Sequence, residues 1–334
     1  MKSLALAAIA GLTIASGAQA ADTVNVQLDY VVRGNHAMFF VAKEKGYFAK
    51  QGIDVATIQK GTGSPNAMRL VGNGNAEFGF GDLPTLAVAR SQDVPVVALV
   101  GVNQHSPLAM LALASKHKLS KPQDLKGMNI GVHPAGSTYI FLKAFLAANG
   151  MTMEDIKQST VTPPYENYLL LGRVDAVPGY VDAEVPELEA KAGGPGSLSV
   201  MLGADFGYVV YGSGLFTAEK VIAEKSDLVQ RFVNAYMQAF ADVIKNPDEA
   251  ADITIKANPE YGPKKDMLVK QIQADVKYTF FSDETKKNGI GWMTPDTWQK
   301  SVKLLVDQGA MKGTIDASKA FTDKYLSAAK PLKQ

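Results

Sequence analysis

Asn35 and His36 stand side by side in a short polar stretch, where they could form directed hydrogen bonds to a small molecule. Asn35 occupies the place of a helix N-cap, so its side-chain oxygen can accept an unpaired backbone N–H. The helix dipole at such a position disfavours a protonated histidine. A neutral imidazole offers one donor and one acceptor. From these residues alone, a ligand contact and an ordinary cap beside a surface histidine both remain open.

Two glycine–serine turns, one in each half of the chain, have matching positions at the start of a predicted helix. They are Gly63-Ser64-Pro65 and Gly136-Ser137-Thr138. Exposed backbone N–H groups and the positive end of the helix dipole make such a turn able to bind an anion or a carbonyl oxygen. Plain helix capping, with Ser64 as the first cap, explains either turn taken alone.

Two acidic residues and four tyrosines could contact a ligand. Asp82 follows Gly81 at a strand end, where it could accept from a ligand or cap the helix containing Pro84. Glu184 begins a helix, where the dipole favours a carboxylate in any case. The tyrosines that could stack on a flat molecule are Tyr30, Tyr165, Tyr180 and Tyr208. Aromatic residues at strand or helix spacing usually belong to the core, so we expect one or two to line a cleft.

The sequence shows no pattern for a metal, a cofactor or catalysis. It contains no cysteine, and its histidines lack metal-ligand spacing: His36, His105, His117 and His133. It also lacks a P-loop and a Ser/His/Asp order. We therefore expect no metal, no cofactor and no catalytic residue, and a protein that holds a molecule rather than converting it.

The polar stretch at residues 32–36 lies within a predicted strand–loop–helix–strand unit at residues 28–55. Ala37, Phe40 and Val41 form an apolar stripe at helical spacing, and Gly46 is a natural residue for the left-handed stop. The loop therefore follows the carboxyl end of a strand and precedes a helix. In an open α/β sheet, ligands bind at that edge.

The same alternation continues along most of the chain. Residues 24–102 alternate strands with helices, and the pattern starts afresh over residues 108–202, which predicts two mostly parallel sheets flanked by helices. Residues 217–330 are nearly all helical in pattern, with Thr217 as a first candidate cap. Since such a segment builds no sheet of its own, we expect it to pack on the first lobe.

The chain must cross twice between the two predicted units, near residues 103–109 and 206–214. Two crossings make a hinge, and hinged lobes close around ligands. We predict a two-lobed α/β fold. Lobe 1 comprises residues 21–105 and 212–334, and lobe 2 comprises residues 106–211.

Length and charge agree with this organisation. A chain of 334 residues is too long for one simple core, so two lobes are expected. Its formal net charge of +1 gives no electrostatic reason for a nucleic acid or an anionic membrane as partner. We expect a monomer that binds a small molecule.

The first 20 residues have the pattern of an export signal. Lys2 precedes an apolar run at residues 4–14, and an A-x-A motif at residues 18–20 stands before Ala21. A membrane anchor needs roughly 18–20 apolar residues, and this run is shorter. We predict cleavage after Ala20. Without a cysteine for lipid attachment, we expect a mature periplasmic protein, with secretion as the alternative.

Five sequence motifs in a fixed order resemble a known family. They are VAKEKGYFAKQGIDV at 41–55, GNAEFGFGD at 74–82, DLKGMNIGV at 124–132, GST at 136–138 and GRVDAV at 172–177. Together they resemble the substrate-binding proteins of nitrate/sulfonate/taurine-type ABC importers. That family shares a two-lobed type 2 periplasmic-binding fold with thiamine-pyrimidine synthase-like proteins. The resemblance extends from about residue 24 to residue 240.

The resemblance implies a shell of two lobes that captures a small molecule and delivers it to the permease and ATPase subunits of an importer. The pair Asn35 and His36 resembles the branch that binds pyrimidine precursors of thiamine. Tyr180 and Glu184 resemble the aromatic and carboxylate positions of that branch. The branch usually carries a tryptophan where this chain has Tyr30, which leaves the ligand class open.

The expected ligand contacts are Tyr30, Asn35, His36, Gly63, Ser64, Asp82, Ser137, Thr138, Tyr180 and Glu184. The first expectation is a heteroaromatic ligand such as a thiamine pyrimidine precursor, and the alternative is nitrate, taurine or an alkanesulfonate. A pyrimidine-synthesising enzyme is a further alternative, but those enzymes use a cysteine-rich iron-binding motif that this chain lacks. A sensory module would need a fused DNA-binding or membrane segment, and none is visible.

Overall fold

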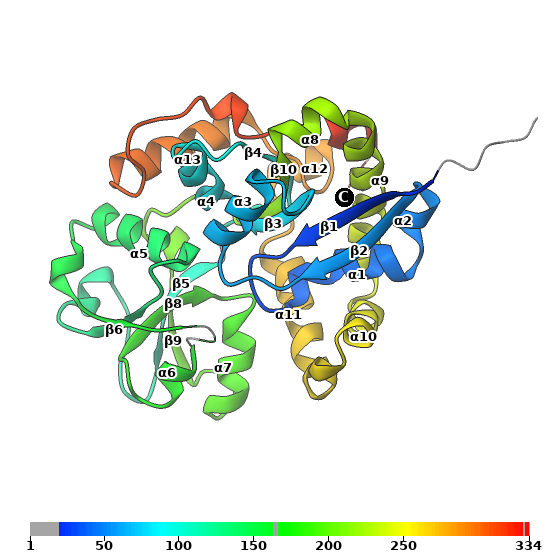
Figure 1. Ribbon diagram of the computed structural model, residues 1–334. Coiled ribbons are helices and arrows are strands. Elements are labelled where there is room, and N and C mark those ends of the chain that lie inside the picture. Colours follow the sequence, from blue (N-terminus) through cyan, green and yellow to red (C-terminus); the bar gives the residue numbers. More distant parts are fainter. Residues whose placement is uncertain (1–19, 163, 165, 330, 334) are drawn as a thin grey trace, which may run out of the picture.

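The computed structural model describes residues 20–162, 164, 166–329 and 331–333. The predicted signal peptide up to residue 19 and the candidate stacking residue Tyr165 lie outside the described residues. The chain forms two lobes, each built on a five-stranded sheet flanked by helices (Figure 1). This is the predicted two-lobed α/β fold.

The sheet of lobe 1 has the strand order β2-β1-β3-β10-β4. Its strands are β1 (Asp22–Gln27), β2 (Ile53–Gln59), β3 (Phe78–Asp82), β4 (Val96–Gly101) and β10 (Ser213–Ala218). β1 runs parallel to β2 and β3, whereas β10 is antiparallel to β3 and β4, so the sheet is mixed. The prediction of Thr217 as a helix cap is wrong, because Thr217 is fully buried within β10.

Short helices connect these strands: η1 (Gly34–His36), α1 (Ala37–Glu44), α2 (Tyr47–Lys50), α3 (Ser64–Gly72) and α4 (Leu83–Arg90). Gly46 has a left-handed φ of 71° between α1 and α2, as its predicted role as a helix stop requires. The predicted cap at Asn35 is wrong. The chain enters α1 through the 3-10 turn η1, and His36 precedes α1 without a side-chain cap.

Lobe 2 repeats the plan with the strand order β7-β6-β8-β5-β9. Its strands are β5 (Leu108–Leu113), β6 (Asn129–Val132), β7 (Lys157–Thr160), β8 (Ala176–Tyr180) and β9 (Leu198–Leu202). Its helices are η2 (Pro122–Leu125), α5 (Ser137–Ala148), η3 (Met153–Asp155), α6 (Glu166–Leu170), α7 (Glu184–Ala192) and η4 (Gly203–Phe206). β5 is antiparallel to both neighbours. Tyr180 is the last residue of β8, and the next helix, α7, begins at Glu184 as predicted.

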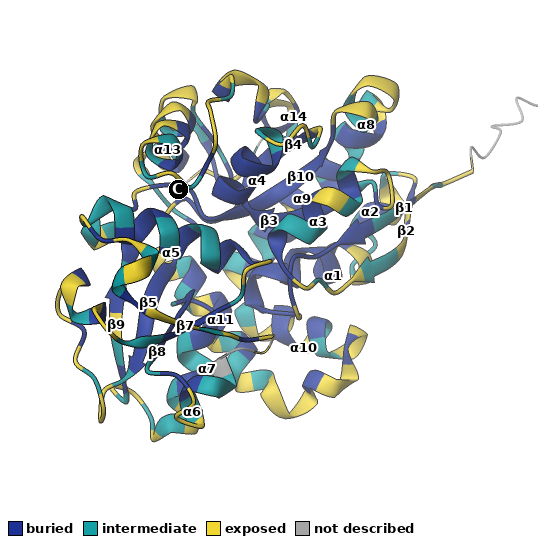
Figure 2. Cartoon of the chain, turned by 60° about the vertical axis from the view of Figure 1, so that its left-hand side comes forward, coloured by how far each residue is buried: buried dark blue, intermediate teal, exposed yellow. Residues whose placement is uncertain are grey.

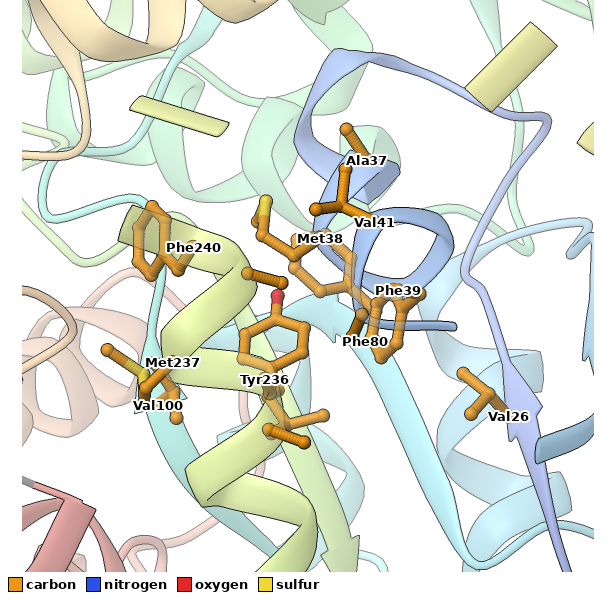
Figure 3. Close-up of a cluster of buried hydrophobic side chains, with 14 of the residues drawn as sticks. Val26, Ala37, Met38, Phe39, Val41, Phe80, Val100, Tyr236, Met237 and Phe240 are labelled. Atoms are coloured by element: carbon orange, nitrogen blue, oxygen red, sulfur yellow. The ribbon is translucent and has the colours of Figure 1, made fainter. Parts of the chain in front are cut away.

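The C-terminal segment is helical and packs on lobe 1, as predicted. Its elements are α8 (Glu219–Glu224), α9 (Ser226–Lys245), α10 (Pro247–Ala257), η5 (Pro259–Lys264), α11 (Lys265–Tyr278), α12 (Asp283–Asn288), α13 (Pro295–Asp307), η6 (Ala317–Lys319) and α14 (Lys324–Ala329). The apolar face of α9 packs against α1 and the sheet (Figure 3). There the ring centroid of Phe39 lies 4.9 Å from that of Tyr236 and 6.1 Å from that of Phe80.

The chain crosses between the sheets after β4 and again before β10. We retain the lobe limits at residues 105/106 and 211/212 as a prediction, which the membership of the two sheets supports. The central strands and the facing sides of the helices are buried, whereas most of the edge strand β7 and the outer turns of α8, α10 and α13 are exposed (Figure 2). No helix within the described part of the chain is long and apolar enough to span a membrane.

Candidate functional site

A small cavity lies between the two lobes, beside the carboxyl ends of β1 and β8 and the starts of α3 and α5. Its volume is about 20 Å³, which is room for about one water molecule. It is lined by Asp29, Tyr30, Arg33, Gly63, Ser64, His133, Gly136, Ser137, Thr138 and Tyr180. A second pocket of about 190 Å³ adjoins it and shares Tyr30 and Arg33 as lining residues.

Six of the ten expected contact residues line the small cavity: Tyr30, Gly63, Ser64, Ser137, Thr138 and Tyr180. Glu184 lines the adjoining pocket. Asn35, His36 and Asp82 are buried but line neither space. The cavity-lining residues Asp29, Arg33, His133 and Gly136 were not among the expected contacts. Ligand contact at the ten expected residues stays a prediction.

The starts of α3 and α5 face each other across the cavity. Gly63 and Gly136 are the N-cap residues, and neither helix has a side-chain cap. Ser64 is therefore the first residue of α3 rather than its predicted cap. A methyl group added to Gly63 would lie 2.8 Å from the carbonyl oxygen of Ala135, so only glycine allows this close approach.

Asp29 is the centre of a buried hydrogen-bond network in lobe 1. His36 donates from Nε2 to Asp29 Oδ1 over 2.9 Å, and its Nδ1 accepts the backbone N–H of Arg33. Ser64 Oγ donates to Asp29 Oδ2 over 3.2 Å. Burial raises the pKa of Asp29, but the hydrogen bond from His36, the charge of Arg33 and the hydrogen bond from Ser64 outweigh burial and hold that pKa below its usual value. His36 thus orients a cavity-lining carboxylate rather than lining the cavity itself.

Asp82 caps helix α4, which was one of its two predicted roles. Its Oδ2 accepts from the backbone N–H of Thr85 at 2.9 Å and from the hydroxyl group of Thr85 at 2.6 Å. Burial raises the pKa of Asp82 from 3.8 to about 7, against the lowering effect of the Thr85 hydrogen bonds. Its Oδ1 is buried and has no hydrogen-bond partner among the residues described. Near neutral pH, this carboxyl group is therefore protonated in part of the molecules and can donate a hydrogen bond.

Tyr30 and Tyr180, from opposite lobes, both contact the guanidinium group of Arg33. The guanidinium carbon lies 4.3 Å from the ring centroid of Tyr30 and 5.0 Å from that of Tyr180. Arg33 Nη2 also donates to Glu184 Oε1 over 2.5 Å. Glu184 Oε2 accepts the backbone N–H of Tyr180, and the Tyr180 hydroxyl group bonds with Ser137 Oγ over 2.7 Å. We call these two rings, the space between them and Glu184 the tyrosine slot.

The other candidate tyrosine on described residues, Tyr208, belongs to the core of lobe 2. Its ring packs edge-on against Phe141 with centroids 5.0 Å apart, and it does not line the cavity. Among the described residues, Tyr30 and Tyr180 are thus the tyrosines that line the cavity, in keeping with the expectation of one or two.

Helix α11 of lobe 1 carries contacts to lobe 2 beside the tyrosine slot. Gln271 accepts the backbone N–H of Gly34 and donates to the carbonyl oxygen of Ala183 over 2.8 Å. Asp275 lies against Asp182 of lobe 2, and both are buried. Burial and the charge of Asp182 raise the pKa of Asp275 well above its usual value. Protonation of one member relieves the repulsion between the two buried carboxylates, so the pair favours a shared proton.

No group of three or more His, Cys, Asp or Glu residues in the described part of the chain is placed to hold a metal ion. The arrangement offers instead two aromatic faces, carboxylates, hydroxyl groups and the N-termini of two helices around one small space. Such a set of groups can hold a small polar molecule by stacking and by hydrogen bonds.

A comparison with known families identifies the family of this chain. A family model described as NMT1/THI5 like matches residues 33–250. The chain belongs to this family. The matched range covers Arg33, Tyr180, Glu184 and both facing helix starts, but neither Tyr30 nor α11.

Three curated relatives of the NMT1/THI5-like chain are each 25% identical to it. The riboflavin-binding protein RibY of Chloroflexus aurantiacus matches over 312 residues, covering 91% of this chain and 86% of RibY. The formylaminopyrimidine-binding protein of Halalkalibacterium halodurans matches over 311 residues, or 92% of each chain. The 4-amino-5-hydroxymethyl-2-methylpyrimidine phosphate synthase THI13 of Saccharomyces cerevisiae matches over 319 residues, covering 93% of this chain and 89% of the enzyme.

A solved structure establishes the fold class. The alkanesulfonate-binding protein SsuA of Xanthomonas axonopodis pv. citri, bound to MOPS, superposes with a TM-score of 0.70 at 14% identity, covering 91% of this chain and 99% of SsuA. The fold is therefore that of the type 2 periplasmic binding proteins, as the sequence motifs predicted.

Proposed function

We propose that this protein is the solute-binding receptor of an ABC importer and captures a small, flat, heteroaromatic molecule between its two lobes. One observation carries the proposal. Tyr30 and Tyr180 come from opposite lobes, and a planar group, the guanidinium of Arg33, already lies against both of their rings. Glu184 at the edge of the same slot can accept from ring or amino N–H groups.

The groups of the slot supply part of the free energy that a receptor needs. Micromolar affinity needs about 8 kcal/mol. An aromatic pair contributes about 0.5–1.5 kcal/mol beyond the area it buries, and a hydrogen bond to a charged group about 1.5–3 kcal/mol. Two stacking faces and one carboxylate supply up to about 6 kcal/mol on this scale, so the burial of the ligand's apolar surface must supply the remainder and offset the cost of association.

The chain is equally similar in sequence to two binding proteins and to a pyrimidine synthase. The choice between receptor and enzyme therefore depends on which residues this chain contains. The chain contains no cysteine for the iron-binding motif expected of the synthases. The names of two relatives, which bind riboflavin and a formylaminopyrimidine, favour binding of a heteroaromatic ring. We propose that the protein is not an enzyme.

The receptor function implies export and a membrane partner. We propose that the signal peptide is cleaved after Ala20, that the mature protein is a periplasmic monomer without a lipid anchor, and that it delivers its ligand to a permease driven by ATPase subunits. The pattern of the first 20 residues and the absence of cysteine support this.

An anionic ligand such as nitrate, taurine or an alkanesulfonate is the second candidate. The glycine-capped starts of α3 and α5 favour it, because both lack a side-chain cap and their first residues, Ser64 and Ser137, line the cavity. In that case Ser64 and Ser137 would be the main contacts, and Arg33 would pair with the anion.

Isothermal titration calorimetry of the mature protein against aminopyrimidines, flavins, taurine, alkanesulfonates and nitrate tests the proposal. We expect one heteroaromatic compound to bind with 1:1 stoichiometry, with Tyr180→Ala weakening binding at least tenfold and Tyr180→Phe retaining most of it, since phenylalanine keeps the stacking face. Glu184→Ala should also weaken it, because ligand donors are left buried without a partner. A response to anions alone would reject the proposal.

A further inference from the structure

Arg33 fills the tyrosine slot in the way that a bound molecule would. Its guanidinium group contacts both tyrosine faces and donates to Glu184, and its side chain is only 7% exposed. Arginine is the side chain best suited to this position, because its planar cation stacks on aromatic rings and bonds to carboxylates along its edge. The contacts join the lobes, because Arg33 and Tyr30 follow β1 of lobe 1, whereas Tyr180 and Glu184 belong to lobe 2.

The same side chain separates the two spaces at the lobe boundary. Arg33 lines the cavity of about 20 Å³ on one side and the pocket of about 190 Å³ on the other. Neither space alone reaches the roughly 300–1,000 Å³ of pockets that hold drug-sized ligands. If the Arg33 side chain turns away, the two spaces and the volume of the guanidinium group itself become one site.

The charges around the slot favour a cationic occupant. The positive charge of Arg33 acts on Asp29 and on Asp182, in addition to the ion pair with Glu184. These three carboxyl groups come from both lobes and are all buried. A neutral or anionic group in place of Arg33 would leave them less compensated, and buried charges are costly without a partner. A planar cation with N–H donors along one edge could reproduce the contacts of the guanidinium group with both tyrosine rings and with Glu184.

We propose that Arg33 is a built-in stand-in for the ligand: it closes the ligand-free protein through the tyrosine slot, and a planar ligand with an N–C–N donor edge, of the amidinium or guanidinium kind, displaces it and takes over Glu184. This inference rests on the proposed function for the view that the slot receives a ligand. Arg33 then sets the specificity of the receptor, because a ligand must outcompete it.

Arg33→Ala tests this by emptying the slot for a probe with the same planar group. We expect methylguanidinium to bind this variant at millimolar concentration and at least tenfold more tightly than it binds the wild-type protein, measured by calorimetry and by a shift in melting temperature. Methylammonium, which has the same charge but no plane, should bind the variant at least tenfold more weakly than methylguanidinium. Equal binding of methylguanidinium to variant and wild type, or of both cations to the variant, would overturn the proposal.

The double variant Arg33→Ala/Glu184→Gln is the matched control. It removes both members of the ion pair, so it avoids a lone buried carboxylate if the single variant folds poorly. We expect it to lose methylguanidinium binding and, by small-angle scattering without ligand, to have a larger radius of gyration than the wild-type protein. A double variant as compact as the wild type would refute closure by Arg33.

The outcome is distinguishable from a failure of the proposed function. Methylguanidinium binding to Arg33→Ala, together with no response of the wild type to any heteroaromatic compound, would uphold the stand-in and reject the heteroaromatic ligand. Tight binding of a heteroaromatic compound that is weakened at least tenfold by Arg33→Ala would uphold the receptor and reject the stand-in, since displacing Arg33 would then bring no gain.

Discussion

The carboxyl group of Asp82 makes the stability of this protein fall as pH rises. Burial raises its pKa from 3.8 to about 7. Between these two values, the folded chain keeps a proton that the unfolded chain releases, so the free energy of unfolding decreases with pH. One pKa unit corresponds to about 1.4 kcal/mol, so the difference between 3.8 and about 7 corresponds to a loss of about 4 kcal/mol, complete above about pH 7.

The substitution Asp82→Asn removes this dependence while keeping the helix cap. In the wild-type protein, the backbone N–H and the hydroxyl group of Thr85 both donate to Asp82 Oδ2. The amide oxygen of asparagine can accept the same two hydrogen bonds. Any packing cost of the amide is the same at every pH and cancels in the comparison. Relative to the wild type, we expect the variant to gain about 3 kcal/mol of unfolding free energy between about pH 4.5 and pH 8.

Urea denaturation of both proteins at several pH values measures this gain. Thr85→Val is a control that should raise the pKa of Asp82 further, because the hydroxyl group it removes lowers that pKa. The stability of Thr85→Val should therefore continue to fall at a pH where that of the wild type has levelled off. Parallel stability curves for wild type and Asp82→Asn would refute the reasoning.

Two further substitutions test lobe closure and the carboxyl pair. Gly63→Ala should weaken ligand binding at least tenfold in calorimetry, because its methyl group would lie 2.8 Å from the carbonyl oxygen of Ala135 and hold the lobes apart. Gly46→Ala is its control, because φ at Gly46 is also positive but no atom lies within 4 Å of the added methyl group. We expect this variant to lose about 1 kcal/mol of unfolding free energy and to keep its affinity for the ligand. Equal affinities for the two variants would contradict this. Asp275→Asn should raise the unfolding free energy more at pH 8 than at pH 5, because it relieves the pairing with Asp182. An equal effect at both pH values would argue against the shared proton.

The fold was predictable where the pattern of apolar residues along the chain is enough to identify a strand or a helix. Alternation of apolar strands with helices gave the extent of both sheets within a few residues except for β10, and the polar strand β7 (KQST) lay outside that pattern. β10 was missed because its partners, β3 and β4, precede it by more than 100 residues, and its sequence SGLFTA carries no turn signal that separates it from the following helix. Its antiparallel direction, which makes the sheet mixed, is likewise a property of the tertiary fold.

The candidate site was predictable where backbone conformation dictates residue type. The two glycine–serine helix starts are readable because a close approach between lobes demands glycine, as Gly63 shows. Arg33 was missed because an arginine has no fixed partner in sequence: Glu184 is 151 residues away and is reached only when the lobes meet. His36 was predicted to contact the ligand, but its place behind Asp29 depends on a hydrogen bond that spacing alone does not reveal.

Mass spectrometry of the small molecule that co-purifies with the mature protein tests the central claim most directly. We predict one flat heteroaromatic molecule per chain, recovered chemically unchanged after incubation and absent from the Tyr180→Ala variant. Recovery of an alkanesulfonate, taurine or nitrate, or of a molecule that the protein alters on incubation, would contradict the account.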